Sequence, residues 1–172
     1  MNIISLQKTL VLSSLALSLF CVGCSNHPQQ VAAAVTGNTL DAISAQQTAE
    51  RNKKIVTDFY EGVFIKHQVK EYSDLYIGNQ YIQHNPHVPD GKAPFVDYFT
   101  GYFKQNPKAK NVIKRAVAEG DLVFLHVHST ENEQDLGVAV VDIFRVENGK
   151  IVEHWDVQQQ VPEKTANTNT MF

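Results

Sequence analysis

The chain has 172 residues and a formal net charge of -3 at pH 7. This length suits one domain with appendages, because single hydrophobic cores usually occupy about 100 to 200 residues. With 15 Lys and Arg against 18 Asp and Glu, the composition gives no cationic field that could hold a phosphate backbone, which argues against a nucleic-acid partner.

The N-terminal segment is typical of a secretory signal. Lys8 precedes an apolar and small-residue run over residues 9–23, which is shorter than the roughly 20 apolar residues of a transmembrane helix. A Gly-Cys pair ends this run at Cys24 and resembles a bacterial lipobox, although Cys21 stands where lipoboxes usually carry Leu. We therefore expect a signal peptide over residues 1–24, lipidation of Cys24, and membrane attachment only through that lipid, in the bacterial cell envelope at the outer membrane. Conventional cleavage with release into the periplasm is the alternative.

Composition also predicts the other boundaries. Residues 25–46 are polar, rich in Gln and Ala and interrupted by Pro28 and Gly37, which predicts a flexible tether. A folded domain is expected over residues 47–162 and a C-terminal tail over residues 163–172. Both cysteines lie before this domain, so we expect neither a disulfide nor thiol chemistry in it.

Hydrophobic periodicity predicts three helices at the start of the domain. Apolar residues recur with the spacing of one helix face from Val56 to Phe64, a shorter helix spans the region from Val69 to Tyr76, and a third follows Gly91. Each helix has an aromatic face to bury, formed by Phe59, Tyr60 and Phe64, by Tyr72 and Tyr76, and by Phe95, Phe99, Tyr102 and Phe103.

Period-two patterns replace the helical ones from about Asn111. Four strands are predicted, over residues 112–118, 122–130, 138–146 and 150–159, and Asn148-Gly149 is the preferred pair of a type I′ hairpin. Helices followed by an antiparallel meander predict an α+β fold, a cone-shaped barrel in which a curved antiparallel sheet packs against the N-terminal helices. A cavity between the layers would hold a small molecule.

Asp142 is the main candidate for chemistry. It interrupts the otherwise apolar run VAVVDIFRV, and a buried carboxylate is costly unless it has a partner or a purpose. We therefore expect its side chain to face the interior, where it could act as a general base.

The hairpin also predicts a register. If Glu147 pairs with Lys150, counting back places Asp142 opposite Trp155. This register puts Phe144, Glu153 and Trp155 on the face of Asp142, and Arg145, Val152, His154 and Asp156 on the other face. For Arg145, His154 and Asp156, an ion-pair cluster at the rim and a catalytic role both stay open.

His126 and His128 alternate with apolar residues and so share one face of their strand. A tight turn after this strand would bring one of them within hydrogen-bonding reach of Asp142, whereas the alternative is a histidine pair on a half-buried strand. With Gly120 and Glu133, the two histidines also match the first metal motif of cupins. No second cupin motif follows, and the helical first half does not suit an all-β fold, so we expect no metal and no other cofactor.

The segments YIQHNPHVPDG, AEGDLVFLHVH and VVDIFRVENGKIVEHWDV resemble the SnoaL-like polyketide cyclase family of the nuclear-transport-factor-like and ketosteroid-isomerase-like superfamily. The likeness runs from about Asn52 to Pro162, and the ending NTNTMF is similar to a subgroup of predicted aldol-condensation enzymes. This resemblance implies the same cone, also described as cystatin-like, a homodimer formed through the sheet, and ring closure by aldol condensation without a metal or organic cofactor.

The resemblance also implies roles for particular residues. Asp142 would be the acid that removes a proton next to a carbonyl, and His84, His126 or His128 would polarise the carbonyl or orient the acid. His84 and Asn85 would face the cavity mouth, although the Asn-Pro pair could simply end a strand. Ligand-binding candidates are Tyr60, Tyr81, Asn85, Tyr98, Phe144 and Trp155.

These expectations describe an envelope domain that binds a small, mostly apolar carbonyl compound and catalyses proton abstraction, aldol-type cyclisation or isomerisation. The second hypothesis is a ligand-binding lipoprotein with the same cavity and no catalysis, since one fold serves many functions. A metal-dependent enzyme that uses His126 and His128 is the third.

Overall fold

The computed structural model describes residues 27–172, and it describes side chains from Thr39 onward. The expected signal peptide and the lipidation at Cys24 therefore lie outside the described residues. The chain divides into two units, with the boundary between residues 37 and 38, and residues 38–172 are the subject below. Among the described helices, none is both long enough and apolar enough to cross a membrane.

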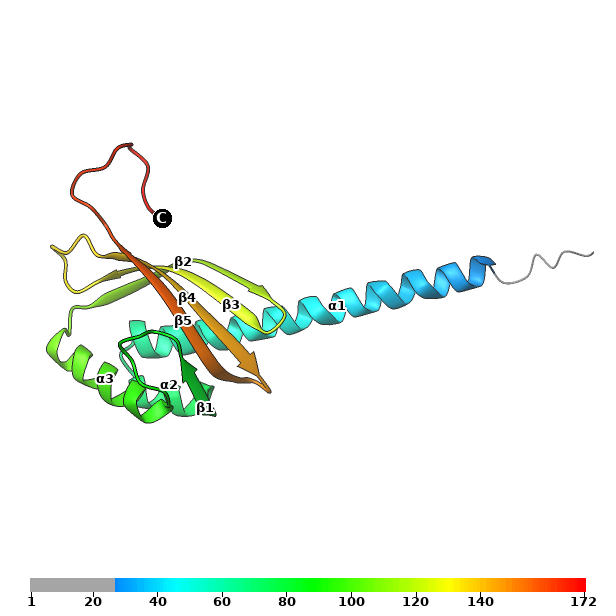
Figure 1. Ribbon diagram of the computed structural model, residues 1–172, viewed down its shortest axis with the longest axis horizontal. Coiled ribbons are helices and arrows are strands. Elements are labelled where there is room, and N and C mark those ends of the chain that lie inside the picture. The colour runs from blue at the N-terminus through cyan, green and yellow to red at the C-terminus, as the bar shows by residue number, and fades with distance from the viewer. Residues whose placement is uncertain (1–26) are drawn as a thin grey trace, which may run out of the picture. The chain divides into compact units, whose positions relative to one another are not determined.

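The three predicted helices are confirmed (Figure 1). They are α1 (His27–Tyr60), α2 (Val69–Tyr76) and α3 (Lys92–Gln105), and a five-residue π-helix, η1 (Glu61–Ile65), continues α1. Helix α1 begins inside the segment expected as a flexible tether. Its Ala and Gln residues favour helix, and Pro28 is tolerated in a first turn. The role of this segment as a tether stays a prediction.

The four predicted strands are also confirmed, as β2 (Lys110–Glu119), β3 (Leu122–Thr130), β4 (Val138–Glu147) and β5 (Lys150–Gln160). They form the expected antiparallel meander, and Asn148 and Gly149 both adopt positive φ, as a type I′ turn requires. The sequence did not predict β1 (Ile77–Gln83) as a sheet member, but it pairs in parallel with β5. The sheet is therefore mixed and open, in the order β1-β5-β4-β3-β2.

The predicted register between β4 and β5 is wrong by one residue. Glu147 pairs with Lys150 as expected, but a shift between Val146 and Arg145 leaves Val152 without a partner. This β-bulge reverses the face of the sheet to which each later side chain of β5 points. Asp142 consequently pairs with Asp156 instead of Trp155. Because side chains alternate along a strand, Phe144, His154 and Asp156 share the face of Asp142, whereas Arg145, Glu153 and Trp155 lie on the opposite face.

The inner face of the sheet packs against the helices, and the core between them is largely aromatic. The ring centroid of Phe59 lies 5.9 Å from that of Phe144 on β4 and 5.8 Å from that of Phe95 on α3. Phe59, Leu125 and Ile151 have no more than 1% of their surface exposed. This burial holds α1 and α3 on the sheet at the place where polar side chains of β4 and β5 also face inward.

The π-helix η1 requires glycine at position 62. A Cβ at Gly62 would overlap the ring of Tyr72 on α2. We expect Gly62→Ala to lower the free energy of unfolding by at least about 2 kcal/mol, because overpacking displaces the ring. Gly101→Ala is the matched control, since its Cβ would meet no atom within 4 Å and should raise stability by about 0.5 to 1 kcal/mol. Urea denaturation measures both, and equal effects would contradict this packing.

Candidate functional site

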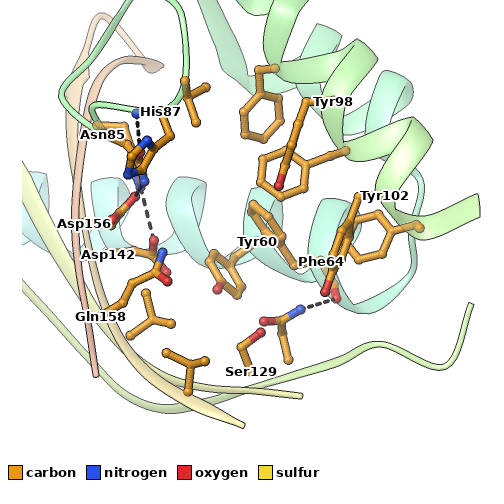
Figure 2. Close-up of a pocket in the computed structure, with 18 of the residues that line it drawn as sticks. Tyr60, Phe64, Asn85, His87, Tyr98, Tyr102, Ser129, Asp142, Asp156 and Gln158 are labelled. Atoms are coloured by element: carbon orange, nitrogen blue, oxygen red, sulfur yellow. Dashed lines mark hydrogen bonds and ion pairs between the residues drawn. The ribbon is translucent and has the colours of Figure 1, made fainter. Parts of the chain in front are cut away.

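A cavity of about 470 Å³ lies between the inner face of the sheet and helices α1, η1 and α3 (Figure 2). This volume is within the range of small-molecule sites, about 300 to 1,000 Å³. One wall is aromatic, formed by Tyr60, Phe64, Phe95, Phe99, Tyr102 and Phe103. The other carries polar groups from β1, β4 and β5 and the loop after β1: Gln83, Asn85, Asp142, His154, Asp156 and Gln158.

Asp142 and His154 form a buried pair on the polar wall. Their exposed fractions are 7% and 8%, and Nε2 of His154 lies 3.1 Å from Oδ1 of Asp142. The other ring nitrogen of His154, Nδ1, lies 2.8 Å from Oε1 of Gln83. Gln83 on β1 thus fixes the ring from the side away from Asp142.

Gln83 also determines where the imidazole carries its proton. The backbone N–H of Asn85 donates to Oε1 of Gln83 at 3.0 Å, which identifies this atom as the amide oxygen, an acceptor. Nδ1 of His154 must therefore donate to it. Nε2 then faces the Asp142 carboxyl, and one proton has to lie between these two acceptor atoms for them to form a hydrogen bond.

The second carboxyl oxygen of Asp142, Oδ2, is buried and has no hydrogen-bond partner among the described residues. An unpaired buried oxygen of this kind costs about 1 to 3 kcal/mol or more. The neighbouring carboxyl of Asp156 does not relieve it, because Asp156 instead accepts a hydrogen bond from Nδ2 of Asn85 at 2.6 Å. Oδ2 of Asp142 is therefore left for a ligand.

Two buried tyrosines share the cavity with Asp142. Burial raises the pKa of Tyr60 well above its usual range, and the negative charge of Asp142 and the approach of the Tyr60 hydroxyl to that carboxyl raise it further. Burial, followed by the same charge, also raises the pKa of Tyr81, whose hydroxyl has no hydrogen-bond partner among the described residues. Both phenols stay protonated at neutral pH and can donate hydrogen bonds into the cavity.

The three histidines proposed from the sequence lie away from Asp142, and the expectation that one of them reaches it is wrong. His84 turns to the outer face, where it stacks on Trp155 at 4.5 Å between centroids and lies 2.8 Å from Oε1 of Glu153. His126 and His128 pair with Val141 and Ala139, whereas Leu125 pairs with Asp142. Because side chains alternate between the two faces along β3, both imidazoles lie on the outer face of the sheet.

On the outer face these two imidazoles have other partners. His126 lies 2.9 Å from a guanidinium nitrogen of Arg115, and His128 lies 2.8 Å from the carbonyl oxygen of Leu136. Both rings stack on the C-terminal Phe172. Their contacts are those of a satisfied pair on a half-buried strand.

Five of the six ligand-binding candidates line the cavity: Tyr60, Tyr81, Asn85, Tyr98 and Phe144. Trp155 does not, because the bulge at Val152 places it on the outer face. Sequence reasoning missed Gln83 and assigned His154 and Asp156 to the wrong face. A signal was present in Ile151-Val152, two successive apolar residues that break the alternation of β5 and are both buried.

One group of side chains among the described residues could hold a metal ion. Asp142, His154 and Asp156 each offer a ligand atom, and these atoms lie within 4.8 Å of one another. His126, His128 and Glu133, the set suggested by the cupin-like spacing, are not brought together in this way.

Comparison with known proteins identifies the family. The model of the SnoaL-like domain family matches residues 56–154, more than half of the chain. No protein of curated function matches it by sequence. A predicted polyketide cyclase from Acidithiobacillus ferrooxidans is 20% identical, with a TM-score of 0.54 over 63% of this chain and 87% of its own.

Two further solved structures are similar. A predicted ketosteroid isomerase from Kribbella flavida is 14% identical, with a TM-score of 0.57 over 70% of this chain and 86% of its own. A cystatin-fold protein from Novosphingobium aromaticivorans is 19% identical, with a TM-score of 0.53 over 62% and 97%. Identities this low show the fold alone. By its match to the family model, the chain belongs to the SnoaL-like domain family.

Proposed function

We propose that this domain binds a small, mostly apolar carbonyl compound and removes a proton from the carbon next to the carbonyl. Asp142 is the base. The observation that supports this most strongly is the free Oδ2 of Asp142, a sheltered carboxyl oxygen on a cavity wall. The aromatic wall opposite would hold the apolar body of the substrate and exclude water.

The neighbours of Asp142 suit the charges that such a reaction develops. As Oδ2 of Asp142 takes the proton from carbon, the bond electrons move to the carbonyl oxygen and form an enolate. The protonated hydroxyl of Tyr60 or Tyr81 can donate a hydrogen bond to that oxygen. His154 holds the carboxyl through Oδ1 and keeps the other oxygen directed at the substrate.

What the enolate does next decides the net reaction. Return of the proton to a different carbon is an isomerisation, and attack of the enolate carbon on a second carbonyl of the same molecule is an aldol-type cyclisation. Both products need the same base and the same hydrogen-bond donors. Neither step needs an electron acceptor, so both are compatible with the residues of this cavity.

A ligand-binding role without catalysis is the second candidate. It is favoured by the same free oxygen, because a ligand hydroxyl or amine that donates to Oδ2 of Asp142 would also satisfy it. The two candidates differ in whether a carbon-bound proton moves.

We expect the protein to catalyse deuterium exchange at the acidic carbon of β-tetralone in heavy water, followed by proton NMR. Asp142→Asn should lower the catalysed rate at least about a hundredfold, because the amide is not a base. His154→Gln should lower it less, since it removes only the group that orients the carboxyl.

The matched control is His126→Gln, which changes a histidine on the outer face and should leave the rate unchanged. Asp142→Asn should keep a melting temperature close to that of the wild type, because the amide has the same shape as the carboxyl and can still form a hydrogen bond with Nε2 of His154. Equal exchange by wild type and Asp142→Asn, with both folded, would contradict the catalytic proposal and leave the binding role. Treatment with a chelator should leave the exchange rate unchanged, and its loss would indicate a metal at Asp142, His154 and Asp156.

We also propose that the protein is carried to the bacterial cell envelope and anchored by a lipid on Cys24. The apolar run over residues 9–23 and the Gly-Cys pair that ends it support this. The full-length protein should then appear in the membrane fraction of expressing bacteria. Cys24→Ser should move the protein to the soluble fraction or leave its signal peptide uncleaved. An unchanged distribution together with unchanged processing would contradict lipid anchoring.

A homodimer formed through the outer face of the sheet is a further part of the proposal. This face exposes two valines, Val117 on β2 at 60% and Val157 on β5 at 64%, and apolar side chains there favour an interface. Sedimentation of residues 39–172 should give a dimer that Val157→Lys converts to a monomer. A wild-type monomer at micromolar concentration would contradict it.

A further inference from the structure

Among the Asp, Glu, Lys and Arg residues that line the cavity, all are acidic. Four carboxylates take part, from Glu131, Asp135, Asp142 and Asp156, and no lysine or arginine is among the lining residues that the structure describes. His154 shares a proton with Asp142, but no lysine or arginine of the described lining offsets the carboxylates of Glu131, Asp135 and Asp156, so the lining carries an excess of negative charge. A phosphate or carboxylate on a ligand would be repelled, whereas a cation would be attracted.

The four carboxylates occupy two separate regions of the cavity. Asp142 and Asp156 lie on the polar wall, and Figure 2 shows Tyr98 and Tyr102 of α3 across the cavity from them. Glu131 and Asp135 follow the end of β3 and line the same cavity as Tyr98 and Tyr102. Their negative charges, after burial itself, raise the pKa of the Tyr102 hydroxyl.

The region around Tyr102 has the composition of a cation site. Tyr98 and Tyr102 stack at 6.4 Å between centroids with 11° between ring planes, and Tyr98 is 57% exposed. The carboxylate of Asp135 accepts hydrogen bonds from the backbone N–H groups of Glu131 and Gly137, which lower the pKa of Asp135 and keep it ionised. Aromatic faces beside fixed carboxylates attract ammonium groups.

We propose that the substrate or ligand of this domain carries an ammonium group, bound between Tyr98, Tyr102, Glu131 and Asp135, while its carbonyl end lies at Asp142. The unpaired Oδ2 of Asp142, in a residue that is 7% exposed, independently marks the other end of the same cavity as a ligand position. The proposal rests on the proposed function for the placement of the carbonyl. It goes further by naming the chemical class at the opposite end, an amino ketone or a related amine-bearing carbonyl compound.

The test compares three acetophenones that differ only in the para substituent: aminomethyl, which is cationic, hydroxymethyl, which is neutral, and carboxylate. Binding to the whole chain is measured by NMR titration at low and high salt, without reference to turnover. We expect the ammonium compound to bind at least about fivefold more tightly than the neutral one, with the carboxylate weakest. High salt should reduce these differences, because it screens charge.

Two variants with the same change of charge locate the subsite. Glu131→Gln should remove most of the preference for the ammonium compound and leave binding of the neutral compound unchanged. Glu133→Gln, in the same loop but not among the lining residues, should leave the preference intact. Tyr102→Leu should weaken the ammonium compound more than the neutral one.

Equal affinity for the ammonium and neutral compounds would overturn the inference and leave the proposed function standing. An equal loss in Glu131→Gln and Glu133→Gln would also overturn it, because only net charge would then matter. If none of the three compounds binds, the cavity is not a site for aryl ketones, and the proposed function fails with the inference.

Discussion

The arrangement of the candidate site depends on one extra residue in strand β5. Val152 has no partner on β4, so the β-bulge at this point shifts the register by one position. Without it, His154 and Asp156 would face outward and Trp155 would face Asp142. With it, an imidazole and two carboxyls meet on the inner face, at a cavity wall. Bulges often lie next to functional sites, because one added residue re-aims every side chain after it.

Strand β1 supplies the residue that orients His154, Gln83. Its parallel pairing with β5 brings Gln83 opposite His154, and the amide oxygen of Gln83 then fixes the imidazole through Nδ1. The backbone N–H of Asn85 holds that amide in turn. Asp142 is left with one oxygen bound to His154 and one oxygen free. An arrangement that keeps a buried oxygen unpaired lowers stability, and such a loss is common where a protein prepares a site for a ligand.

Much of the fold follows from local patterns in the sequence. The helix-spaced apolar residues of α1 and the aromatic residues of α3 predicted which faces are buried, and period-two alternation located β2 to β5. Asp142 was recognisable because a charged residue on a strand that is apolar on both faces has to be explained. These predictions needed only the properties of neighbouring residues in the chain.

The parts that failed depend on pairing between distant segments. Counting from the Asn148-Gly149 turn assumes an unbroken ladder, and a single unpaired residue reverses every assignment beyond it. His84 was expected at the cavity mouth, but it directly follows β1, which pairs with β5, and it stacks on Trp155. The faces of His126 and His128 likewise depended on the register of β3 against β4. No local sequence pattern predicts the register between two strands, although Ile151-Val152 indicated where the regular pairing could be interrupted.

The state of His154 tests the central claim most directly. Nitrogen chemical shifts of its side chain, measured by NMR on isotope-labelled protein, report which ring nitrogen carries a proton. The structure predicts a protonated Nδ1 that donates to Gln83 and a proton at or next to Nε2 that is shared with Asp142. This pattern should change in Asp142→Asn and persist in His126→Gln. A neutral ring protonated at Nε2 alone, with a bare Nδ1, would contradict the account.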